Sequence, residues 1–104
     1  MLGGRPALLS ADGRLRVLVS CPDGNPEDCA GMLRARIGGR RGQMLDRARY
    51  RLRPGRRANV AFDLSPRETR RAGDAKLTLQ ADEIDADGRE RHIFRRMSVR
   101  RTLD

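Results

Sequence analysis

Apolar and polar residues alternate with a period of two along most of this chain, which is the pattern of half-buried β-strands. In the first such run, Leu15, Val17 and Val19 share one face. The alternating runs are 14–20, 31–37, 45–53, 58–64, 77–81 and, less regularly, 89–101. The inner faces are predicted to meet through Leu15, Val17, Val19, Leu33, Ala35, Ile37, Tyr50, Leu52, Val60, Phe62, Leu77 and Leu79.

Turn signals separate these runs. Pro54 and Gly55 suit a tight turn, because proline presets φ and glycine accepts a positive φ. Asp87 and Gly88 stand between two strand-like runs and predict a hairpin. Short strands joined by such turns, with little helix, predict an all-β fold: an immunoglobulin-like antiparallel β-sandwich of six to seven strands. A small closed barrel is the alternative.

One segment has the signals of a helix. Ser65 at the N-cap, Pro66 at the first helical position and Glu68 two residues later form a helix start with a capping box. We expect one short helical turn near 65–71, ended by Gly73.

The two ends of the chain are less regular. Residues 1–13 show no period and are predicted to be a flexible N-terminal arm, with a short edge strand at 7–9, ahead of a single sandwich domain at 14–104. In the last run, Phe94 has the opposite parity to Ile93. A β-bulge near residues 95 and 96 would return Phe94 to the core.

Cys21 and Cys29 are the two cysteines of the chain, and they flank the loop Pro22–Asp28 between two strand-like runs. The spacing predicts a disulfide that staples a β-hairpin, and therefore an oxidising compartment. Two free thiols in a cytosolic protein, or half of a metal or redox site, are the alternatives. A zinc site needs four ligands, of which only His92 remains, and a redox pair is normally C-x-x-C.

The chain is strongly basic, with a net charge of +9 from 23 basic and 14 acidic residues. Such a balance suggests a nucleic acid, an anionic membrane or an acidic polymer as partner. Lys76 is the single lysine beside 22 arginines, a profile that GC-rich coding also produces without selection for binding.

The best functional feature is a row of four arginines, Arg47, Arg49, Arg51 and Arg53, which alternation places on one strand face. Residues two apart on a strand lie about 7 Å from each other, so the row could follow phosphates or acidic sugars. Alternatively, the arginine stems cover the sheet while their charged ends remain in water.

No catalytic constellation or cofactor motif is visible, and we expect neither an enzyme nor a bound metal. His92 has no nearby nucleophile that suggests a triad. The segment Glu83–Gly88 is similar to a calcium loop, but it begins with Glu and has Phe94 where the bidentate Glu should stand.

The order of these pieces resembles the immunoglobulin-like or fibronectin-III-like β-sandwich modules of secreted and surface proteins in GC-rich bacteria. A strand ending at Cys21-Pro22 leads through a loop to Cys29, and a strand ending at Pro54-Gly55 follows; Asp87-Gly88 and a closing strand complete the order. The resemblance covers residues 14–103.

The resemblance implies a non-catalytic extracellular or cell-surface module with a structural, spacer or adhesive role. Its partners would be other domains of a larger secreted protein or a cell-surface component. Export would need a leader that this chain does not show, and no stretch is suited to span a membrane. The alternative function is a basic β-domain that binds nucleic acid or another polyanion through arginine-lined sheet faces.

Overall fold

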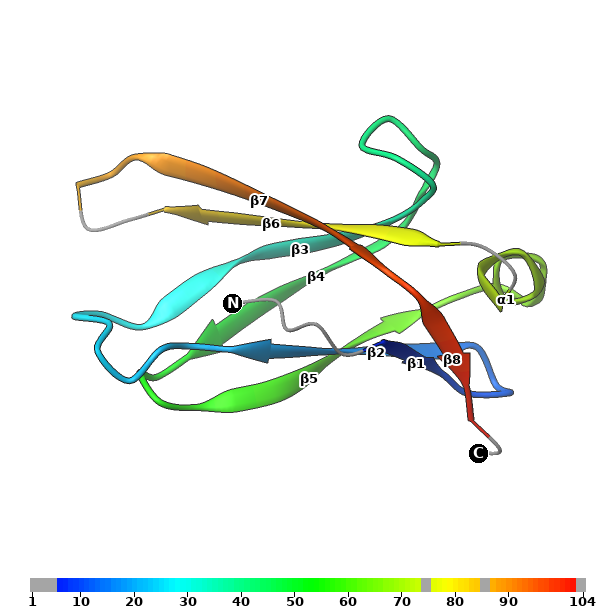
Figure 1. Ribbon diagram of the computed structural model, residues 1–104, viewed down its shortest axis with the longest axis horizontal. Coiled ribbons are helices and arrows are strands. Elements are labelled where there is room, and N and C mark those ends of the chain that lie inside the picture. The colour runs from blue at the N-terminus through cyan, green and yellow to red at the C-terminus, as the bar shows by residue number, and fades with distance from the viewer. Residues whose placement is uncertain (1–5, 74–75, 85–86, 103–104) are drawn as a thin grey trace.

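The computed structural model describes residues 6–73, 76–84 and 87–102, and they form an all-β sandwich with one short helix (Figure 1). The elements are β1 (Ala7–Leu9), β2 (Arg14–Ser20), β3 (Cys29–Ile37), β4 (Met44–Leu52), β5 (Arg57–Asp63), α1 (Pro66–Gly73), β6 (Leu77–Ile84), β7 (Glu90–Met97) and β8 (Val99–Arg101). The predicted fold class is therefore confirmed. The described residues hold eight strands rather than six to seven, because residues 7–9 pair and the last run divides in two.

The strands form two sheets of four, with the orders β5-β2-β1-β8 and β4-β3-β6-β7. All pairs are antiparallel except β1 with β8, which run parallel. In Figure 1 the two sheets lie as layers, and the chain passes from one to the other where β7 continues into β8.

The predicted inner residues meet between the sheets. Leu15, Leu33 and Leu79 are fully buried, and Ile37 and Leu52 pack against the same cluster. Burial of each large aliphatic side chain stabilises the fold by about 1.5–3 kcal/mol, so this cluster is the main favourable contribution to folding.

Residues 7–9, which lie within the predicted arm at 1–13, are part of the sandwich. Strand β1 lies between β2 and β8, and Ala7 and Leu9 are 0% and 1% exposed. Residues 7–9 are therefore an internal strand, and the domain begins before residue 14. The sequence predicted a strand here but assigned it to the arm as an edge strand, because a run of three residues is too short to show a period.

The helix forms where the capping signals placed it. The backbone N–H of Ser65 donates to Oε1 of Glu68 at 2.9 Å, and the N–H of Glu68 donates to Oγ of Ser65 at 3.2 Å. These two bonds are the reciprocal pair of a capping box. Thr69 and Ala72 are the buried residues of α1, which reaches to Gly73.

The predicted bulge near residues 95 and 96 is wrong. Strand β7 pairs with β6 in unbroken register from Glu90 to Met97, so Phe94 faces away from the core. The chain instead changes sheets at Ser98, whose carbonyl accepts the N–H of Ala7. The register shift that the structure does contain lies between β3 and β4, at Ala35 and Arg36.

Both predicted glycine turns have the expected backbone. Gly55 has a φ of +81° and Gly88 a φ of +78°, values that favour glycine over residues with a Cβ. The N–H of Arg56 donates to the carbonyl of Arg53 at 3.0 Å, which closes the turn between β4 and β5.

Candidate anion-binding face

The predicted disulfide is present, but it does not staple a hairpin. Cys21 and Cys29 are bonded, with their Cα atoms 5.6 Å apart. Cys21 follows β2 and Cys29 begins β3, and these two strands belong to different sheets. The bond therefore ties one sheet to the other at one end of the sandwich.

The disulfide is buried and held by neighbouring backbone. The cysteines are 3% and 6% exposed. The N–H of Cys21 donates to the carbonyl of Arg56, and its own carbonyl accepts the N–H of Gly55. The turn between β4 and β5 is thus attached to the same point as the loop between β2 and β3.

The outward side of the sheet β4-β3-β6-β7, which we call the outer face, carries the charged side chains in rows across the strands. One row is Arg49, Met32, Asp82 and His92. The next is Arg47, Arg34, Gln80 and Phe94. The last is Met44, Arg36, Thr78 and Arg96. Carboxylates therefore occur in the first row and are absent from the other two.

The first row belongs to a mixed half of the outer face, where opposite charges pair. Asp82 forms an ion pair with Arg34, and its Oδ1 lies 2.6 Å from Nδ1 of His92. Nε2 of His92 is 3.8 Å from a carboxylate oxygen of Glu90. Among the described residues, the neighbours of the imidazole in register and along the strand carry no hydroxyl or thiol.

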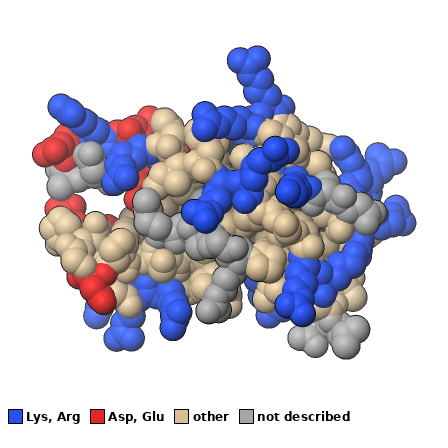
Figure 2. Space-filling view, viewed as in Figure 1, with Lys and Arg blue, Asp and Glu red and all other residues tan. Residues whose placement is uncertain are grey.

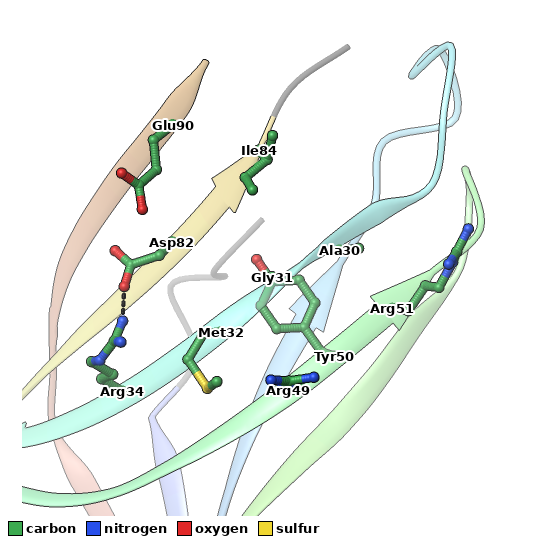
Figure 3. A pocket seen from close by; sticks show the side chains of 10 residues that line it. All are labelled: Ala30, Gly31, Met32, Arg34, Arg49, Tyr50, Arg51, Asp82, Ile84 and Glu90. Atoms are coloured by element: carbon green, nitrogen blue, oxygen red, sulfur yellow. Dashed lines mark ion pairs between the residues drawn. The ribbon is translucent and has the colours of Figure 1, made fainter. Parts of the chain in front are cut away.

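A hollow of about 790 Å³ opens in this mixed half (Figure 3). Met32 lies in its middle, with Arg49 on one side and the carboxylates of Asp82 and Glu90 on the other. Ile84, at the rim, is 72% exposed. The hollow thus has an apolar centre between walls of opposite charge.

Tyr50 is the buried polar residue beside this hollow. It lies opposite Gly31, which in turn lies opposite Glu83, and the tyrosine hydroxyl donates to Oε1 of Glu83 at 2.5 Å. Burial raises the pKa of Tyr50, and the hydrogen bond and charge of Glu83 raise it further. A Cβ on Gly31 would stand 2.2 Å from the carbonyl oxygen of Asp82, so only glycine fits at the centre of this row.

The other rows form a basic half, which we define as Arg36, Arg40, Arg47, Arg96 and Phe94. Arg40 comes from the loop between β3 and β4, and its Cζ lies 4.1 Å from the centre of the Phe94 ring. The Thr78 hydroxyl donates to the carbonyl of Gly38, which attaches this loop to β6. Across the described chain, no carboxylate lies within ion-pair distance of these four arginines.

The wider charge distribution follows the same division. In the view of Figure 2, acidic side chains appear at the end that carries the turn between β6 and β7, whereas basic side chains appear at both ends.

The predicted arginine row is only partly continuous. Arg47, Arg49 and Arg51 are exposed on β4, and Arg53 follows the end of that strand. Nε of Arg51 lies 3.0 Å from Oδ2 of Asp28, so this member has an acidic partner. Sequence reasoning found this strand but missed Arg36, Arg40, Arg96 and Phe94, because the register between strands, which it lacked, brings them together.

The candidate metal and calcium sites do not form in the part of the chain that the structure describes. No group of three or more His, Cys, Asp or Glu side chains there is placed to hold a metal ion. Of the calcium-like segment Glu83–Gly88, residues 85 and 86 lie outside the described residues. No described helix has the length and apolar character needed to cross a membrane.

No protein-family model, curated protein or solved structure matches the chain.

Proposed function

We propose that this chain is a non-catalytic β-sandwich module of a secreted or cell-surface protein, with a structural or adhesive role. The observation that carries the proposal is the buried Cys21–Cys29 bond between the two sheets. Structural disulfides persist in oxidising compartments and are rare where cytosolic reductants keep thiols reduced.

The connectivity supports the module interpretation. The connections from β2 to β3, from β4 to β5 and from β5 through α1 to β6 all pass from one sheet to the other. Such crossings, with a shared core between aligned sheets, are typical of immunoglobulin-like sandwiches. Folds of this kind hold their binding surfaces on loops or sheet faces, which fits an adhesive or spacer role.

The test is the redox state of the two cysteines in protein from the native host. Cells are lysed in iodoacetamide without reductant, and the intact mass of the purified protein is measured. We expect no alkylation, whereas a control reduced before alkylation should gain two adducts. Two adducts without prior reduction would refute an extracellular assignment.

A further inference from the structure

We propose that the basic half of the outer face binds an acidic polysaccharide through the guanidinium groups of Arg36, Arg40, Arg47 and Arg96. The proposal rests on the extracellular role proposed above, to which it adds a class of ligand. It also moves the binding surface from the predicted row on β4 to a patch that spans the sheet.

Charge repulsion between neighbouring arginines favours an anionic ligand on this half of the outer face. Arg34 and Arg47 lie directly opposite each other in register on β3 and β4. Like charges in this position destabilise a strand pair, whereas opposite charges stabilise it by up to about 1 kcal/mol. Arg34 is balanced by Asp82, but Arg47 has no carboxylate partner among the described residues. An anionic ligand would supply the missing countercharge.

The guanidinium of Arg36 is poorly satisfied by its neighbours in the protein. Its Nη1 donates to the carbonyl of Gly42 at 3.5 Å, the limit of a hydrogen bond, and its Nε is buried without a partner. The buried Nε cannot reach a ligand, but the weakly held Nη1 at the end of the side chain can turn to a sulfate or carboxylate, which accepts charge-assisted hydrogen bonds from arginine.

The arginines of the basic half are spread over several strands. Arg36 and Arg96 are separated by the strand β6, at Thr78, so their Cα atoms stand about 10 Å apart. Arg47 lies one row along and one strand across from Arg36. Several anionic groups of one extended chain could therefore be contacted together, as a polymer of charged sugars presents them.

The aromatic residues favour a polysaccharide over a nucleic acid. Single-stranded nucleic acids gain much of their affinity when bases stack on exposed aromatic rings. Phe94 is the aromatic residue of the outer face, and Arg40 already covers its ring. Tyr50 and Phe62 are buried. Binding by charge alone suits sulfated or uronic acid sugars better than bases.

The experiment compares two triple variants that remove equal charge. Arg40→Gln/Arg47→Gln/Arg96→Gln changes the basic half, and Arg49→Gln/Arg51→Gln/Arg53→Gln changes the rest of the predicted row. All six arginines are exposed; Arg40 contacts the ring of Phe94, and Arg51 forms an ion pair with Asp28. Binding of a fluorescent heparin hexasaccharide is measured by anisotropy from 0.05 to 0.2 M salt, with circular dichroism to check folding.

Four ionic contacts predict that the affinity of the wild-type protein falls roughly 50- to 150-fold over this salt range. The variant of the basic half should keep one ionic contact, so its affinity should be lower at 0.05 M salt and fall only about threefold by 0.2 M salt. The control variant should behave like the wild type. Equal loss in both variants, or no binding by the wild type, would overturn the proposal.

An oligonucleotide of twelve thymidines separates the two kinds of polymer. Phe94→Leu keeps an apolar side chain but removes the ring, so it should leave hexasaccharide binding within about twofold. Tighter binding of the oligonucleotide than of the hexasaccharide, lost in Phe94→Leu, would overturn the polysaccharide in favour of nucleic acid. The redox state of the cysteines is not involved, so failure here leaves the proposed module role standing.

Discussion

Reduction of the Cys21–Cys29 bond should lower stability without abolishing the fold. The bond joins the two sheets, yet they remain connected through the hydrogen bonds of Cys21 with the turn between β4 and β5. The chain also passes between the sheets where β7 continues into β8. The free energy of unfolding should therefore fall by the contribution of one cross-link, while the interface between the sheets remains.

The magnitude follows from the sequence separation of 8 residues between the cysteines. In the chain-entropy model, closing a loop of this length in the unfolded state contributes about 2.5 kcal/mol at 25 °C. For a domain of this size, such a loss lowers the Tm by about 10–20 °C. It is also a large part of the about 5–15 kcal/mol by which folded domains are stable.

Urea unfolding with and without dithiothreitol, followed by circular dichroism, measures this difference. A typical dependence on urea converts the loss into a midpoint lower by about 1–2.5 M. The variant Cys21→Ala/Cys29→Ala is the control, because its midpoint should not respond to dithiothreitol. Equal midpoints for the oxidised and reduced wild type would refute the reasoning that the bond constrains the unfolded chain.

Three further predictions concern single residues. Gly31→Ala should cost about 1–3 kcal/mol in urea unfolding, because its Cβ would meet the Asp82 carbonyl, whereas Gly24→Ala has open space and should be near neutral. Tyr50, the single tyrosine, has a raised pKa, so its phenolate absorbance should stay low in folded protein above pH 10.0 but rise in urea. Because the unfolded state releases the tyrosine proton first, the free energy of unfolding should fall as pH rises above 10.0. A urea midpoint that does not change with pH would contradict this prediction. Ser65→Ala should lose about 1 kcal/mol on thermal unfolding, and an unchanged Tm would argue against the cap.

The parts of the fold that depend on local sequence could be predicted. Alternation marked the long strands, and the side chains of Ser65 and Glu68 made the bonds that the capping box requires. Strand partners could not be predicted in this way, because pairing depends on contacts distant in sequence. The loop between the cysteines looks like a hairpin connection, yet β2 pairs with β5 and β3 with β4 and β6.

The candidate site was also only partly predictable, because it depends on contacts between residues that are distant in sequence. The arginines of β4 were visible because they follow one another along one strand. Arg36, Arg40 and Arg96 come from two strands and a loop, so their proximity follows from the register and not from spacing. The position of Phe94 was wrong because an aromatic residue was assumed to belong in a thin core. Arg40 stabilises the ring on the outer face by a cation–π contact, worth about 0.5–1 kcal/mol at an exposed site.

The disulfide and the basic half act on stability in opposite directions. Repulsion among unpaired guanidinium groups on the outer face lowers the free energy of unfolding, and the bond between the sheets raises it at the other end. A polysaccharide that neutralised the arginines would add about 2.7 kcal/mol at a hundred times its Kd, since it would bind only the folded chain. This is close to the contribution of the disulfide. Because the two sites share no residues, their contributions to the free energy of unfolding should add.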